Sequence, residues 1–522
     1  MKILKNKYIV FFLLTIVLLI FLKVDYRFKY TIECCSDEYD YFIHAVTIVE
    51  DFDLDYSNQN LRGFRYTNEE INAPVGFVGT GILLAPFLYL GDFINEVFNE
   101  TIHDTLFNYQ ILMYSLGSVF YFFLAYYFIF KTMKLLNYSI NRFKLLFIYS
   151  ASGLPYYAFE RFGMTHVFEV VTISALIYLL SQFYLTNQRV KLNSLIIPVL
   201  LFLSFSVRMS NFYIFLIPYI IYKFLDNEFD TKNRLFKSKY FISSLFLSTY
   251  IYYQVNIQIY GKFIINPQLI YSDSRSANDY VKSIFDIPSV IFEIAQSSLN
   301  VLFTFEFGLF WMSPILFFGT VVCLYLILDI KKIENILLFL CFAQNFIIVF
   351  LWQSLGSSYG FRYLFSLIPI SLFILFVLKV ENKIVINYLT YFSVLSLLGV
   401  LFFETTELTQ LSTIPEVNSF GKLIRYVEPI YVRGLILSFF EFESYLRIFT
   451  TSFLGAIFFK IFITFYDLQS VNKILSSLNL PTENQDFQNY LLNINEVSFD
   501  KFLIIFLTCS YIAYNITFKL KE

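Results

Sequence analysis

Long apolar runs recur along almost the whole chain, and they constrain the fold more than any other feature. Residues 109–130, 167–185 and 365–378 are examples, each carrying one charged residue at most. Of the 522 residues, 57% are hydrophobic and only 15% are charged, whereas a soluble protein carries about 25% charged residues. Because about 20 apolar residues cross a bilayer as a helix, we predict an all-α polytopic membrane protein with roughly 11–13 transmembrane helices.

The charges that flank these runs indicate how the chain is oriented in the membrane. Lysines at positions 2, 5 and 7 precede the apolar residues 8–22, and no small-residue cleavage site follows. This segment is therefore predicted to be an uncleaved anchor with a cytoplasmic N-terminus, and the later loops agree with the positive-inside rule at nearly every turn. The side of the C-terminus stays open, because strict alternation places it outside whereas Lys519 and Lys521 favour the inside.

Residues 33–60 follow the first apolar segment directly and are crowded with carboxylates. Apolar residues recur there at helical spacing, and a residue suited to an N-cap, Ser36 or Asp37, stands before them. We therefore predict a short amphipathic helix at the membrane surface on the outer side. The apolar face is formed by Tyr39, Phe42, Ile43, Val46 and Val49, and the acids are Asp37, Glu38, Asp40, Glu50, Asp51, Asp53 and Asp55. So many acids at a fixed distance from a span indicate a site rather than a linker.

The sequence divides into three parts. Residues 1–403 are predicted to form a transmembrane module, in which residues 25–108 are the first outer loop with its interfacial helices. Within that loop, residues 74–90 are apolar but interrupted by prolines and glycines, which favours a second interfacial or re-entrant helix over a regular span. Residues 404–443 form another outer loop, and residues 444–522 form C-terminal transmembrane helices with a polar connecting loop.

Polar residues gather at the predicted outer ends of several spans. Arg161, His166 and Arg208 each stand at such an end, and Arg362 follows a Gly/Ser-rich break at residues 353–360. Arg161 and Arg208 suit two roles equally, substrate binding or snorkelling to the interface, and His166 is either an interfacial residue or a hydrogen-bond donor to an anionic group. For Arg362 a functional role is favoured, because breaks of this kind line cavities rather than face lipid.

Other site chemistries find little support. A net charge of −2 offers no basic surface for nucleic acid. Asp51, Asp53 and Asp55 do not form a calcium loop, because Tyr56 stands where the loop needs glycine and Arg62 where it needs glutamate. We therefore expect no cofactor and leave the question of a divalent metal open.

Taken in order, the motifs resemble those of the GT-C superfamily of integral-membrane glycosyltransferases. The branch in question holds the protein O-mannosyltransferases, the lipid A aminoarabinose transferases and their bacterial relatives. The resemblance covers about residues 1–400, with Ser357 in place of a second glycine and without the larger outer domains of the family after Glu404. The matching stretches are S-D-E-Y-D-Y at 36–41, the Pro/Gly helix at 74–91, Tyr156-Tyr157, M-T-H at 164–166, G-L-F-W-M-S-P at 308–314, Trp352 and G-S-S-Y-G-F-R at 356–362.

The resemblance implies a function. A polyprenyl-phosphate sugar would be the donor, and a hydroxyl of a glycan, lipid or protein would be the acceptor. The reaction would take place among membrane lipids on the outer face of a bacterial plasma membrane. Asp37 would act as general base with inversion at the sugar, and Glu38 would orient the acceptor. Arg362, Arg208 and His166 would meet the leaving phosphate, with Arg161 as a further substrate-binding residue. The alternative is a polytopic lipid or polysaccharide transporter or flippase, which explains the spans but not the acidic first loop.

Overall fold

The computed structural model describes most of the chain. The described residues are 6–24, 36–59, 65–68, 71–98, 108–186, 190–229, 235–265, 287–304, 308–352, 360–402, 436, 439–440, 442–466, 468–477 and 485–521. Inside helices and strands, a few of these residues, among them Ser36 and Asp37, are described by their backbone alone. The predicted outer loop at 404–443 and the cysteines Cys34 and Cys35 lie almost entirely outside the described residues.

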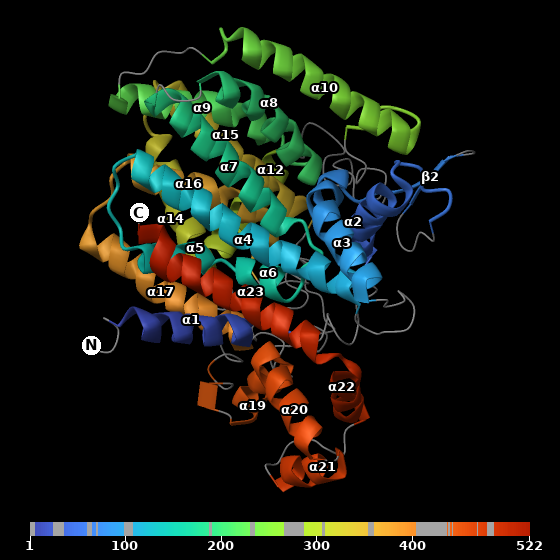
Figure 1. The fold of residues 1–522 in the computed structure, drawn as a ribbon. Helices are drawn as coiled ribbons and strands as arrows, with labels where there is room; N and C mark the ends of the chain where they lie inside the picture. The colour runs from blue at the N-terminus through green and yellow to red at the C-terminus, as the bar shows by residue number, and fades with distance from the viewer. Residues whose placement is uncertain are drawn as a thin grey trace.

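The described chain is built almost entirely of helices (Figure 1). The first half holds α1 (Lys7–Phe21), α2 (Ser36–Val46), η3 (Thr47–Asp51), β1 (Arg65–Asn68), β2 (Ile71–Pro74), α3 (Val78–Phe98), α4 (Tyr109–Leu135), α5 (Arg142–Ser150), α6 (Leu154–Phe159), α7 (His166–Leu185), α8 (Val190–Val207), η4 (Phe212–Leu216), α9 (Ile217–Phe229) and α10 (Lys239–Tyr260). The second half holds α12 (Ile287–Phe303), α13 (Leu309–Met312), α14 (Pro314–Leu326), α15 (Ile333–Trp352), η8 (Arg362–Leu367), α16 (Ile368–Val377), α17 (Lys383–Phe402), α19 (Phe442–Thr451), α20 (Phe453–Phe465), α21 (Leu468–Ser477), α22 (Gln485–Glu496), α23 (Phe499–Phe518) and η11 (Lys519–Lys521).

Length and composition confirm the predicted class, an all-α polytopic membrane protein. Among the described residues, seven helices are long and apolar enough to cross a membrane, and five further apolar helices have 10–17 residues. The seven lie in α3, α4, α7, α8, α15, α17 and α23. The helix α10 has the length of a span but falls outside this set, and it lies at the edge of the molecule (Figure 1). Several of its aromatic side chains are exposed.

The helix α7 forms the centre of the molecule. Every side chain from His166 to Ile177 is buried, and α7 packs against α4, α8, α9 and α16. A helix that is apolar all round is expected in such a position. The one acid in this helix, Glu169, is therefore surrounded by protein.

Close helix packing explains the glycines of the first loop. The helix α2 begins at Ser36, one of the two residues that were predicted to cap it, and packs against α3. A Cβ placed on Gly81 would lie 2.4 Å from the Cβ of His44 in α2, and one on Gly79 would lie 2.4 Å from the backbone nitrogen of Val207 at the end of α8. These glycines let α3 approach its neighbours. The helix is continuous over 21 residues despite Pro86 and is long and apolar enough to cross a membrane, whereas the sequence favoured an interfacial or re-entrant helix there. Between α2 and α3, β1 and β2 form an antiparallel hairpin in which Arg65 pairs with Pro74.

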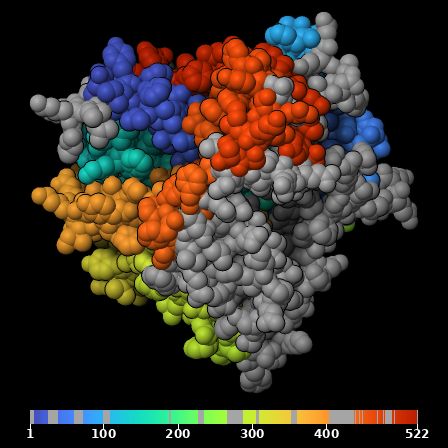
Figure 2. All heavy atoms as spheres, turned by 90° about the horizontal axis from the view of Figure 1, so that it is seen from below, coloured from blue at the N-terminus to red at the C-terminus, as the bar shows by residue number. Residues whose placement is uncertain are grey.

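Both termini lie on the same side of the molecule. The Tyr8 ring in α1 lies 5.8 Å from the Phe518 ring at the end of α23, and Arg142 donates to the Thr517 carbonyl oxygen at 2.6 Å. Figure 1 places both ends on the left and α2 on the right, and Figure 2 shows α1 (blue) beside the C-terminal helices (orange to red). Of the two alternatives for the C-terminus, this arrangement agrees with the one that Lys519 and Lys521 favour.

Candidate functional site

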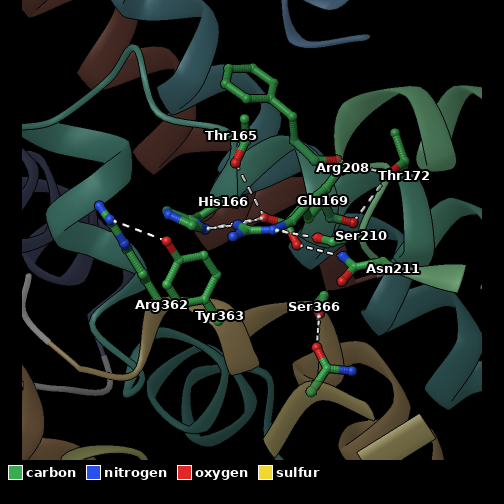
Figure 3. Close-up of polar contacts among 12 residues, drawn as sticks. Thr165, His166, Glu169, Thr172, Arg208, Ser210, Asn211, Arg362, Tyr363 and Ser366 are labelled. Carbon is green, nitrogen blue, oxygen red and sulfur yellow. Dashed lines mark hydrogen bonds and ion pairs between the residues drawn. The ribbon is translucent and has the colours of Figure 1, made fainter. Parts of the chain in front are cut away.

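Residues far apart in the sequence meet beside the first turn of α7 (Figure 3). The turn between α6 and α7 supplies Arg161, and the first turn of α7 supplies His166 and Glu169. Arg208 comes directly after the last residue of α8, and Arg362 and Tyr363 open η8. Each of these side chains thus stands at the end of a helix, where the backbone leaves its regular path and a polar group can turn inward.

Glu38 and Arg161 form a buried ion pair that fixes the start of α2 to this region. Arg161 donates from Nε to Oε1 of Glu38 at 3.0 Å and from Nη2 to Oε2 at 3.2 Å. These two hydrogen bonds make the contact bidentate. The Arg161 side chain is 12% exposed and the Glu38 side chain 5%, so the contact is also shielded from water. A Cβ on Gly163 would lie 3.0 Å from the Cβ of Glu38, which shows how closely α2 approaches the α6–α7 turn.

Glu169 is the acceptor on which four donors converge. Its Oε1 accepts hydrogen bonds from Arg208 Nη1 at 2.9 Å, His166 Nδ1 at 3.1 Å and the Thr165 hydroxyl at 3.3 Å. Its Oε2 accepts a hydrogen bond from Asn211 Nδ2 at 2.8 Å. The side chain is 1% exposed, and a buried carboxylate persists only when charged or polar partners compensate for its lost hydration. We call Thr165, His166, Glu169, Arg208 and Asn211 the Glu169 cluster.

The Tyr363 ring connects the Glu169 cluster to the second arginine of the site. The guanidinium carbon of Arg208 lies 4.2 Å from the centroid of this ring, and that of Arg362 lies 5.2 Å from it. Arg362 also donates from Nη2 to the Tyr363 hydroxyl at 3.4 Å. Two guanidinium groups thus share one aromatic ring, a cation–π arrangement that holds two positive charges near each other.

Aromatic side chains enclose the imidazole of His166. The Tyr157 ring lies edge-on at 4.7 Å, and the Phe365 and Tyr363 rings lie at 5.9 Å and 6.3 Å. Together with Glu169 and Arg208, whose polar atoms lie within 3.3 Å of Nδ1, these rings leave the imidazole little freedom to turn. His166 is thereby held in one orientation.

The other histidine that the structure describes belongs to a separate, structural contact. His44 in α2 donates from Nε2 to the Gly76 carbonyl oxygen at 2.9 Å, and its Nδ1 accepts from the Tyr56 hydroxyl at 2.5 Å. Burial lowers the pKa of His44 to about 4, in part opposed by the hydrogen bond to Gly76. Within the described part of the chain, no three His, Cys, Asp or Glu side chains come together as metal ligands would.

The predicted site residues separate into two neighbouring groups. His166, Arg208 and Arg362 come together around Tyr363, whereas Glu38 and Arg161 pair with each other. The Asp37 side chain lies outside the described residues, although the backbone of α2 carries it next to Glu38. Its role stays a prediction.

Two residues that organise the site, Glu169 and Tyr363, were not predicted from the sequence. A signal was present for Glu169, because a lone acid inside an apolar span is costly and therefore marks a function by default. Tyr363 carried no such signal in a chain with 41 tyrosines.

Fold and site together define an all-α polytopic membrane protein with a buried polar cluster at one end of its helices. No family model matches the chain, and no curated protein is significantly similar to it. Among solved structures, the chain is similar to the apo crystal structure of the Archaeoglobus fulgidus oligosaccharyltransferase, at 12% sequence identity and a TM-score of 0.38. The alignment covers 84% of this chain and 55% of that one, so the chain spans about half the length of that structure. A likeness of this degree carries no argument about activity.

Proposed function

We propose that the chain is a membrane glycosyltransferase that moves a sugar from a polyprenyl-phosphate donor to a hydroxyl of a glycan, lipid or protein. The observation that carries the proposal is the meeting of the acidic helix α2 with cationic residues from three other parts of the chain. Glu38 contacts Arg161, and Arg208 and Arg362 lie around Tyr363 beside the same end of α7. A glycosyl transfer from a lipid phosphate needs both kinds of group, a carboxylate that acts as base and takes the proton of the acceptor hydroxyl, and cations that stabilise the leaving phosphate.

In this proposal α2 supplies the base, and the arginines around Tyr363 stabilise the leaving phosphate. Asp37, next to Glu38 on α2, takes the proton from the acceptor hydroxyl, whose oxygen attacks the anomeric carbon from the side opposite the phosphate. The bond from that carbon to the phosphate oxygen breaks with inversion, and the phosphate leaves with the electron pair. Arg362 and Arg208 stabilise the charge that develops on it, because preorganised donors act strongly where water is excluded.

The side of the membrane follows from charge. The helix α4 ends near Lys131 and Lys134, and the two termini lie at that same end of the molecule, away from α2. By the positive-inside rule this end faces the cytoplasm, so the proposed site faces the outside of a bacterial plasma membrane. The polar cluster at helix ends also suits an enzyme better than a transporter, whose ionisable groups gather near the middle of the bilayer.

The proposal is tested by transfer itself. Purified protein in vesicles is incubated with radiolabelled polyprenyl-phosphate mannose, glucose and galactose and with a lipid extract that supplies acceptors. We expect label to appear in a new product with wild type and not with Asp37→Asn. Movement of the labelled donor across the vesicle membrane without a new product would instead identify the transporter or flippase.

A further inference from the structure

The two buried histidines differ in the kind of partner that each ring nitrogen meets. For His44, Nε2 lies 2.9 Å from the Gly76 carbonyl oxygen. A carbonyl oxygen only accepts, so Nε2 must carry the hydrogen, and Nδ1 then accepts from the Tyr56 hydroxyl. His44 is thereby fixed as the tautomer with hydrogen on Nε2.

The partners of His166 require the opposite tautomer. Its Nδ1 lies 3.1 Å from Glu169 Oε1, which only accepts, and 3.3 Å from Arg208 Nη1, which only donates. These two contacts cannot both be hydrogen bonds of a single tautomer. The carboxylate contact is the shorter, and Arg208 Nη1 already donates to Glu169 at 2.9 Å. The hydrogen therefore sits on Nδ1 of His166 and points at Glu169.

This assignment decides what His166 offers to a ligand. With the hydrogen on Nδ1, the neutral ring presents an unprotonated Nε2, which accepts hydrogen bonds and donates none. None of the hydrogen bonds among the described residues uses this nitrogen, and the ring as a whole lies among Arg208, Tyr363 and Arg362 (Figure 3). A phosphate oxygen is itself an acceptor and does not suit Nε2, whereas a hydroxyl group does.

We propose that Glu169 is a positioning residue that holds His166 with an unprotonated Nε2, and that this nitrogen binds a hydroxyl group of the sugar. This inference rests on the proposed function for its ligand but not for its tautomer. It changes the role of His166 from a donor to the phosphate, as the sequence suggested, to an acceptor that selects the sugar. Arg208 and Arg362 remain the groups that meet the phosphate.

Glu169 is suited to this role because its carboxylate is buried and both of its oxygens are hydrogen-bonded. It is 1% exposed, and Thr165, Arg208 and Asn211 hold both of its oxygens along with His166. The ring that it orients is enclosed by Tyr157, Phe365 and Tyr363. A fixed carboxylate that sets the tautomer of a histidine is a common way of making one ring nitrogen available to a ligand.

The tautomer of His166 can be determined by nitrogen-15 NMR, without an activity assay. The chain has three histidines, so protein labelled with ¹⁵N-histidine in detergent at pH 8 gives few signals, which His44→Gln and His103→Gln variants assign. We expect His166 to carry its hydrogen on Nδ1 and His44 on Nε2. A spectrum in which His166 carries its hydrogen on Nε2 overturns the inference. Glu169→Gln should change the His166 signals and leave those of His44 in place, and if that variant does not fold, the wild-type spectrum still decides.

The ligand is tested with donors that lack one hydroxyl at a time. Monodeoxy and monofluoro analogues of the polyprenyl-phosphate sugar that is turned over are compared in wild type and in His166→Ala. We expect one position at which removing the hydroxyl lowers kcat/KM on the order of tenfold in wild type, about one hydrogen bond, and not at all in His166→Ala. Equal losses in both proteins at every position overturn the hydroxyl assignment. If none of the donors is turned over, the proposed function fails and the ligand with it, whereas the tautomer remains decided by the spectrum.

Discussion

The buried contact between Glu38 and Arg161 gives the sharpest prediction about stability. Replacing Arg161 by methionine leaves a carboxylate that is almost fully buried, and replacing Glu38 by glutamine leaves a buried guanidinium. Removing one partner of a buried pair costs about 3–5 kcal/mol, because the remaining charge keeps its desolvation penalty and loses the attraction of that partner. Replacing both partners removes the penalty as well as the attraction. The double variant Glu38→Gln/Arg161→Met should therefore be more stable than either single variant.

The measurement is the free energy of unfolding of the detergent-solubilised protein, titrated with sodium dodecyl sulfate and followed by circular dichroism. Wild type, the two single variants and the double variant form a double-mutant cycle. The exposed pair of Lys332 and Asp329, at 3.5 Å and 58% and 51% exposed, is the matched control and should give a coupling of at most about 1 kcal/mol. If the two single losses at Glu38 and Arg161 simply add in the double variant, the reasoning about this pair is wrong.

Three further predictions concern catalysis and pH. Asp37→Asn keeps a capping oxygen and should fold normally but lose at least about 10²-fold in transfer rate, and full turnover by a well-folded variant would exclude Asp37 as the base. Arg362→Ala should raise the barrier by about 2.7–4 kcal/mol while Arg362→Lys keeps part of the rate, and an unimpaired Arg362→Met would leave Arg208 alone at the phosphate. Because burial lowers the pKa of His44 from 6.5 to about 4, the unfolded chain binds the proton first as the pH falls. The stability that neutral His44 contributes is present above pH 6.5 and is lost as the pH falls through about 4, a loss of about 3 kcal/mol. Between pH 8 and pH 4 the melting temperature should therefore fall more steeply for wild type than for His44→Gln.

Much of the architecture could be predicted from local patterns. Apolar runs of about 20 residues decide between membrane and water, so the polytopic class followed from composition and spacing. The existence of α2 followed from a helical repeat behind two candidate capping residues, Ser36 and Asp37, and the helix begins at the first of them. The buried Ile43, Val46 and Val49 belong to the apolar face that was predicted for it. The arginines and His166 stand at helix ends, as the break between apolar and polar sequence indicated.

By itself the sequence determined which segments are apolar helices and which polar residues mark their ends, because both properties depend on neighbours along the chain. The tertiary structure alone decided the partners. Arg161 lies 123 residues from Glu38, and Arg208 lies 39 residues from Glu169. Such pairs form only when helices pack side by side, and the cost of burying an unpaired charge then selects the partner that packing brings within reach. The position of the C-terminus beside the N-terminus was decided in the same way, by the contact of α23 with α1.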